Sequence, residues 1–185
     1  PLRLIKIITP VFIFLFMGCD IVANLSYNNP LDVEDTEVPA LVFSPEATQA
    51  GVGGTAVFKV YAVQVSGVSG IHAQITYDNS TLGVTNVVPG DFLNDGQLSP
   101  MFFTKPANPQ TATGTLDIYY FFLGSEVTRD GSGTVAQINF TTKQTTASQT
   151  DGVSLIEITS ESEFVDPDDI PIPINFLGQG TVEVQ

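Results

Sequence analysis

The chain has one cysteine, Cys19, among its 185 residues, and one histidine, His72. A lone thiol cannot form an internal disulfide, so the fold does not depend on disulfide bonds. A catalytic thiol needs a base beside it. His72 stands in a different part of the sequence, so the pair does not indicate a thiol enzyme.

Basic residues are also scarce. Six Lys and Arg stand against 20 Asp and Glu, which gives a formal net charge of −14 at pH 7. Nucleic acids require a basic surface, so this composition argues against them as partners. Tryptophan is absent, but 13 Phe and five Tyr are present. Together with many Thr, Val, Gly, Ser and Asn residues, this favours strands and turns over helices.

The N-terminus has the pattern of an export signal. Arg3 and Lys6 precede "IITPVFIFLFMG", an uncharged run over residues 7–18. The run is shorter than the roughly 20 residues of a membrane-spanning helix, but it suits the apolar region of a signal peptide. With "FMGC" at residues 16–19, the segment resembles a bacterial lipoprotein signal. The resemblance implies a signal peptide over 1–18, a lipid on Cys19 and an exported protein held at the periplasmic face or the cell surface. The alternative is a buried N-terminal element with an incidental cysteine.

An acidic segment follows the cysteine. Residues 20–39, "DIVANLSYNNPLDVEDTEVP", carry five acidic residues and no basic one. Such a composition is typical of a solvated linker, so residues 19–39 are interpreted as the lipidated N-terminus and an acidic tether. An extra edge strand in "DIVANLSY" is the alternative.

Residues 40–185 predict one all-β domain. Short segments of strand-forming residues recur between turn signals, and no helical period of useful length appears after Cys19. The segment 70–78, "GIHAQITYD", alternates cleanly between apolar and polar residues. In 55–65 the apolar residues cannot all face one way, which predicts a bulge or burial on both faces. About nine strands in one domain imply two packed sheets.

The order of these segments resembles a cohesin domain. The similar pieces are "AGVGGTAVFKVYAVQV", "SGVSGIHAQITYDNSTLGVTNVVPGDFL", "LDIYYFF", "GSGTVAQINFTT" and "EFVDPDDIPIPINFLGQGTVEV", in that order. The resemblance implies a two-sheet jelly-roll sandwich of about nine strands. It also implies that the protein is no enzyme, needs no cofactor beyond the lipid, and docks non-covalently to a dockerin-like protein module.

One face of the sheet carries the candidate partner-binding residues. Alternation along 70–78 places His72, Gln74 and Thr76 on the face opposite Ile71, Ala73, Ile75 and Tyr77. The resemblance adds Asp117, Tyr119 and Phe121 to the same surface. Because the segment around 117–121 is apolar on both faces, the alternative is that Tyr119 and Phe121 lie in the core or beneath a loop.

Other interpretations follow from the same residues. Exposed aromatic side chains on a sandwich also suit a carbohydrate-binding module with a polysaccharide ligand, and a structural envelope lipoprotein is a further alternative. The carboxylates of Asp166, Asp168 and Asp169 could bind Ca²⁺, but they lack the spacing of a known loop, so no metal site is assigned.

Overall fold

The computed structural model describes residues 31, 33–34, 37–94, 96, 99–106, 111–124, 127–147 and 152–185. This part of the chain contains strands and turns without a helix, so it has no helix that could span a membrane. The prediction of an all-β fold is confirmed. Cys19, the predicted signal peptide and the first half of the predicted tether lie outside the described residues.

Thirteen strands are present in the described residues. They are β1 (Ala40–Ser44), β2 (Ala47–Ala50), β3 (Thr55–Val68), β4 (Gly70–Asp78), β5 (Leu82–Pro89), β6 (Met101–Lys105), β7 (Thr113–Phe121), β8 (Arg129–Thr142), β9 (Ser154–Ile158), β10 (Glu163–Val165), β11 (Pro171–Ile172), β12 (Phe176–Leu177) and β13 (Gln179–Val184). The number exceeds the expected nine because β2, β10, β11 and β12 span only two to four residues. Strands that short show little alternation in sequence.

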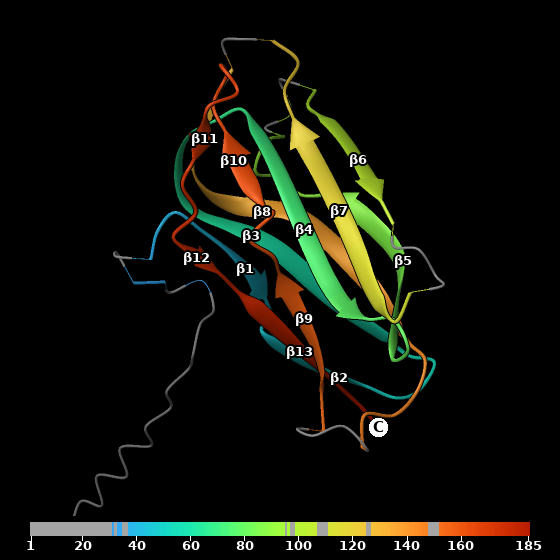
Figure 1. Cartoon of the computed structure of the whole chain (residues 1–185). Coiled ribbons are helices and arrows are strands. Elements are labelled where there is room, and N and C mark those ends of the chain that lie inside the picture. The colour runs from blue at the N-terminus through green and yellow to red at the C-terminus, as the bar shows by residue number, and fades with distance from the viewer. Residues whose placement is uncertain are drawn as a thin grey trace, which may run out of the picture.

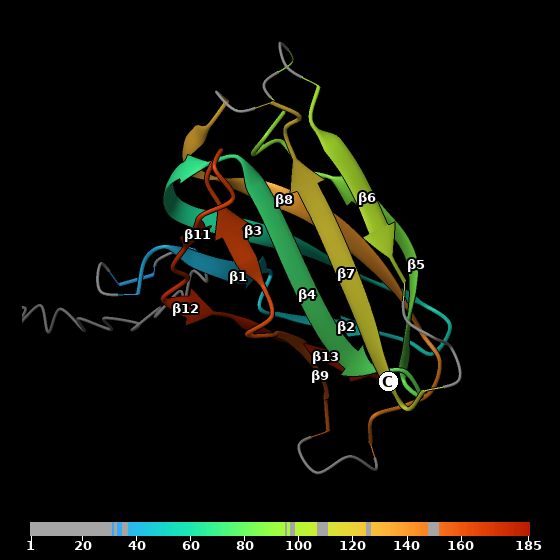
Figure 2. The same ribbon diagram turned by 45° about the horizontal axis from the view of Figure 1, so that its top comes forward.

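The strands form two sheets that pack face to face, as Figures 1 and 2 show. The first sheet has the order β12-β1-β3-β8-β5. In the second sheet, β4 pairs along its whole length with β7, and β7 pairs with β6. The opposite edge of β4 pairs with β10 at its start and with β9 further on, and β13 and β2 follow β9. This is the two-sheet sandwich that the sequence predicts.

The chain passes from one sheet to the other repeatedly, and two of these crossings lie at the edge of the first sheet formed by β1 and β12. β1 lies in the first sheet and β2 in the second, with Pro45 between them. Near the C-terminus, β12 lies in the first sheet and β13 in the second, with Gly178 between them. A Cβ atom on Gly178 would lie 2.9 Å from Cα of Val42, so only glycine fits this close approach of two backbones. The two crossings close this side of the sandwich.

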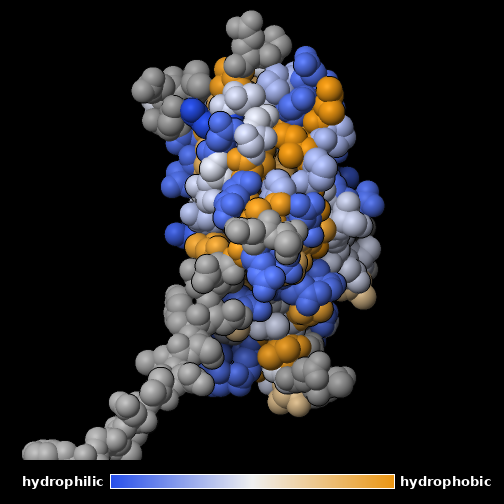
Figure 3. Space-filling view, turned by 90° about the vertical axis from the view of Figure 1, so that its left-hand side faces the viewer, coloured by the Kyte–Doolittle hydropathy of each residue, from blue (hydrophilic) through white to orange (hydrophobic). Residues whose placement is uncertain are grey.

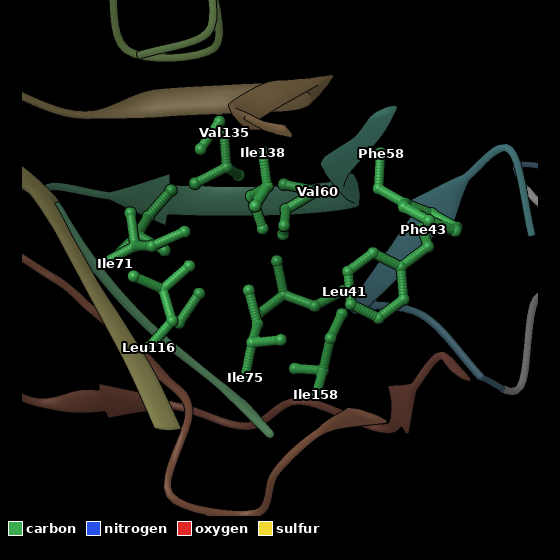
Figure 4. Packing of buried hydrophobic residues seen from close by; sticks show 14 of the residues in the cluster. Leu41, Phe43, Phe58, Val60, Ile71, Ile75, Leu116, Val135, Ile138 and Ile158 are labelled. Atoms are coloured by element: carbon green, nitrogen blue, oxygen red, sulfur yellow. The ribbon is translucent and has the colours of Figure 1, made fainter. Parts of the chain in front are cut away.

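The core consists of the inward-facing side chains of both sheets, as Figure 4 shows. Ile71 and Ile75 of β4 and Leu116 of β7 meet Val60 and Ile138 from the first sheet. Three phenylalanines pack edge to face: the ring centroid of Phe58 lies 5.7 Å from that of Phe43 and 6.2 Å from that of Phe140. Because edge-to-face contacts add to the gain from burial, this cluster is a main source of stability.

The predicted irregularity in the 55–65 segment is confirmed. The pairing of β3 with β8 shifts register between Val60 and Tyr61 and again between Ala62 and Val65. Gln64, in the second shift, has a positive φ of 48°. The shifts allow Val60, Ala62, Val63 and Val65 all to be buried.

The segment before β1 packs onto the domain. Leu31, Val33 and Val38, which belong to the predicted tether, contact a small apolar cluster on the outer face of the first sheet, made of Ala40, Val42 and Val63. Alternate residues of β1 therefore serve two clusters, because Leu41 and Phe43 point into the main core. The contacts place these three residues on the outer face of the first sheet.

Candidate functional site

The six predicted partner-binding residues lie together on the outer face of the second sheet. His72, Gln74 and Thr76 project from β4, and Asp117, Tyr119 and Phe121 project from its neighbour β7. The antiparallel register places His72 opposite Tyr119 and Gln74 opposite Asp117. Directly opposed side chains on one face of a sheet are in contact distance.

Tyr119 and Phe121 belong to this face and not to the core. Leu116, Ile118 and Tyr120 are the residues of β7 that point into the core, and all three are buried. Tyr119 and Phe121 alternate with them and are partly exposed. The alternative that placed these two aromatic residues in the core is therefore wrong.

A third strand, β6, extends the site beyond the six predicted residues. Met101, Phe103 and Lys105 stand opposite Phe121, Tyr119 and Asp117 on the same face. Met101 is 47% exposed and Phe103 is 49% exposed. Alternation in "MFFTK" already places these three residues on one side, but the sequence does not reveal that β6 pairs with β7.

Aromatic rings form a continuous stack across the three strands. The imidazole of His72 and the ring of Tyr119 are nearly parallel, at 4° and with 4.5 Å between centroids. The ring of Phe103 stacks on Tyr119 at 4.7 Å and 22°. Phe121 meets Phe103 edge to face at 6.0 Å and 89°, so it ends the stack. We call the surface of β6, β7 and β4 around His72, Phe103, Asp117, Tyr119 and Phe121 the aromatic face.

A polar network holds the middle of the aromatic face in place. Oδ1 of Asp117 lies 3.0 Å from Nε2 of His72 and accepts a hydrogen bond of 3.0 Å from the side chain of Gln74. The Gln74 side-chain oxygen accepts a hydrogen bond from the Thr159 hydroxyl at 2.9 Å. Each of these side chains is fixed by a neighbour, so the face is preorganised.

Asp117 is the most buried member of this network, with only 7% exposure. Burial alone would raise the pKa of its carboxyl group. The hydrogen bonds from Gln74 and His72, together with nearby positive charge, outweigh burial and lower the pKa below its ordinary value. The group is therefore an anion at neutral pH, and it orients its neighbours as an acceptor.

The carboxylate of Asp166 stabilises the turn over residues 166–169. Oδ1 of Asp166 accepts hydrogen bonds from the backbone N–H groups of Asp168 and Ile170, both at 2.9 Å. In the part of the chain that the structure describes, no three His, Cys, Asp or Glu side chains are grouped so that they could hold a metal ion.

A two-sheet sandwich that carries ordered aromatic side chains on one outer face is the architecture of an all-β binding module. The match to a family is direct: the model of the cohesin domain covers residues 41–184, so the chain belongs to the cohesin domain family. Cohesin domains are non-catalytic binding modules.

Solved cohesins share the fold at low sequence identity. The non-cellulosomal cohesin of the archaeon Archaeoglobus fulgidus has a TM-score of 0.60 at 15% identity, covering 79% of this chain and 90% of its own. CaCohA2 of Clostridium acetobutylicum has a TM-score of 0.60 at 21% identity, covering 79% and 91%. The sixth cohesin of scaffoldin B from Acetivibrio cellulolyticus was solved in complex with a mutant Cel5 dockerin. It has a TM-score of 0.58 at 20% identity, covering 79% and 98%. No curated protein sequence matches the chain.

Proposed function

We propose that the chain is a docking module that binds a dockerin-like protein through the aromatic face. The observation that carries the proposal is the ring stack of His72, Tyr119 and Phe103 on the outer face of the second sheet, where Phe103 is exposed. Interface centres are enriched in aromatic residues and poor in mobile charged ones. Membership of the cohesin family and the complexes of similar cohesins with dockerins support this choice of partner.

The ring geometry favours a protein partner over a polysaccharide. In the stack, each ring turns its face toward the ring on the next strand, at 4.5 and 4.7 Å between centroids. The two faces of the Tyr119 ring are therefore turned toward neighbouring rings, which leaves its edge for a partner. A sugar ring stacks on an open aromatic face, whereas a protein side chain packs well against ring edges and between them.

Binding to dockerin modules tests the proposal. The full chain, purified from membranes in mild detergent, is titrated with the dockerins encoded in the same genome. At least one is expected to bind saturably with a Kd below about 1 μM, which corresponds to about 8 kcal/mol. Binding of soluble xylan or cellulose oligosaccharides with no dockerin bound would favour the carbohydrate-binding alternative. Binding of neither would leave a structural envelope lipoprotein.

The proposal includes a lipid anchor at Cys19. The segment around Leu31 and Val33 packs on the outer face of the first sheet, opposite the aromatic face. An anchor reached through this segment would leave the aromatic face directed away from the membrane. Residues 20–30 could span at most about 40 Å, so the module would stay close to the bilayer.

Replacing the cysteine tests the anchor. In the native host, Cys19→Ala is expected to move the protein from the membrane fraction to the soluble or secreted fraction and to abolish incorporation of labelled fatty acid. Cys19 is the only cysteine of the chain, so no other thiol can carry the lipid in this variant. Ser26→Ala, a matched small change in the segment after the cysteine, should leave both readouts unchanged. Membrane retention with lipid labelling in Cys19→Ala would contradict the anchor.

A further inference from the structure

A groove of about 630 Å³ adjoins the aromatic face where β4 begins. Gly70 forms part of its lining, Phe121 and Leu123 stand on the β7 side, and Val165 stands on the β10 side. The groove is continuous with the aromatic face, because His72 and Tyr119 also line it. A partner on the aromatic face would therefore reach the groove as well.

The close packing of the strands beside the groove requires a glycine at position 70. In the register of the sheet, Gly70 lies between Phe121 of β7 and Val165 of β10. A Cβ atom on Gly70 would lie 2.8 Å from Cγ2 of Val165 and 3.3 Å from Cβ of Phe121. The two neighbouring side chains thus close over the glycine position, and a larger residue would have to displace them. Strand residues thus form one part of the lining, and loop residues such as Leu123 and Asp166 form the rest.

Negative charge collects along one wall of the groove. Glu163, Asp166 and Asp169 line it, while no Lys or Arg does. In the described part of the chain, none of these three carboxylates forms an ion pair. The Asp166 carboxylate is held by its two backbone hydrogen bonds, so its position is fixed before any partner arrives.

The opposite wall is apolar and exposed. Phe121 and Leu123 line it, and Leu123 is 74% exposed. Figure 3 views the flank of the molecule on which β10 and β11 lie, and it shows hydrophobic and hydrophilic residues side by side there. A ligand that satisfies such a groove needs both a cationic group and an apolar surface.

We propose that the groove receives an arginine side chain of the protein partner, with an apolar residue beside it that covers Leu123 and Val165. This inference rests on the proposed function and specifies the chemistry of the partner at one end of the aromatic face. The guanidinium group pairs with the Glu163 carboxylate and packs against Phe121, and the neighbouring apolar residue fills the remaining volume.

Charge and shape select arginine among the possible occupants. A metal ion is disfavoured because the carboxylates are not grouped as ligands. A guanidinium group is planar and weakly hydrated, so it packs on aromatic rings and forms paired hydrogen bonds with carboxylates, whereas an ammonium group is a compact and strongly hydrated charge. A second copy of the chain is disfavoured by its own excess of acidic residues.

A dipeptide titration tests the groove without a dockerin. The full chain, labelled with ¹⁵N and kept in mild detergent at low salt, is titrated with acetyl-Leu-Arg-amide and followed by ¹H–¹⁵N spectra. Saturable shifts are expected at the amides of Gly70, Phe121, Glu163 and Val165. Acetyl-Leu-citrulline-amide has the same shape without the charge and should produce no saturable shift. The lysine analogue should bind at least threefold more weakly.

Two isosteric variants distinguish binding of the dipeptide in the groove from non-specific electrostatic attraction to an acidic protein. Glu163→Gln is expected to weaken binding of the arginine dipeptide at least threefold. Glu161→Gln removes the same charge from an exposed residue outside the groove and should leave binding unchanged. Equal losses in both variants, equal shifts with citrulline, or shifts confined to another surface would overturn the proposal.

The dipeptide and dockerin results can fail independently. If a dockerin binds but the arginine dipeptide does not map to the groove, the inference about arginine is wrong and the proposed function stands. If the dipeptide binds in the groove while no dockerin binds, the groove is a cation-selective site and the proposed function fails.

Discussion

Tyr119→Ala is expected to weaken binding of a dockerin module by at least about 30-fold, which corresponds to about 2 kcal/mol. Tyr119 is the middle ring of the stack, with His72 on one side and Phe103 on the other. Its loss removes the contact area of one aromatic ring and also frees both neighbours to rotate. The effect is therefore larger than that of removing a ring at the end of the stack. Calorimetric titration with the dockerin identified for the wild type measures it.

Tyr61→Ala is the matched control for Tyr119→Ala. Tyr61 is a half-buried tyrosine on the first sheet, where it packs beside Val42 and Val63 on the opposite side of the sandwich. Its replacement should leave the Kd within about twofold of the wild type. If Tyr119→Ala also stays within about threefold, the dockerin binds elsewhere and the assignment of the aromatic face is wrong.

The sequence predicts β4 and its two faces because alternation is a local property. "GIHAQITYD" has apolar residues at every second position, and the structure buries Ile71, Ala73, Ile75 and Tyr77. A shift by one residue would expose all four, so the pattern permits one orientation only. For the same reason, three of the six predicted binding residues follow from the order of residues in a single strand.

The other half of the aromatic face depends on contacts between distant segments. β7 is apolar on both sides, so its sequence cannot tell Tyr119 from Tyr120; only pairing with β4 and β6 assigns the first to the surface and the second to the core. The stacking of Phe103 on Tyr119 likewise requires the register of β6. Pairing between strands is non-local information, which a single sequence without homologues does not supply.

The groove at Gly70 is an example of a feature with no signal in the sequence. A glycine at the start of a strand reads as part of a turn. In the structure its role is steric, because Val165, 95 residues later in the chain, pairs with it from β10. β10 itself is only three residues long, too short for its alternation to be recognised in the sequence.

Phe58→Ala is expected to lower the free energy of unfolding by about 3–5 kcal/mol. Phe58 is fully buried, and its ring makes edge-to-face contacts with both Phe43 and Phe140. The replacement leaves a cavity between the two sheets and removes two aromatic contacts. Domains of this size have a total stability of about 5–15 kcal/mol, so the loss is a large share of it. Denaturant unfolding followed by far-UV circular dichroism measures the change.

Phe103→Ala is the matched control, because the same atoms are removed from a side chain that is 49% exposed. Its effect on stability should stay below about 1 kcal/mol, since no buried cavity forms. In dockerin binding the same variant should show a clear loss, because Phe103 belongs to the aromatic face. The pair thus separates the two uses of phenylalanine in this chain: Phe58 holds the sheets together, and Phe103 is available to a partner. Equal destabilisation by both replacements would contradict the assignment of Phe103 to the surface.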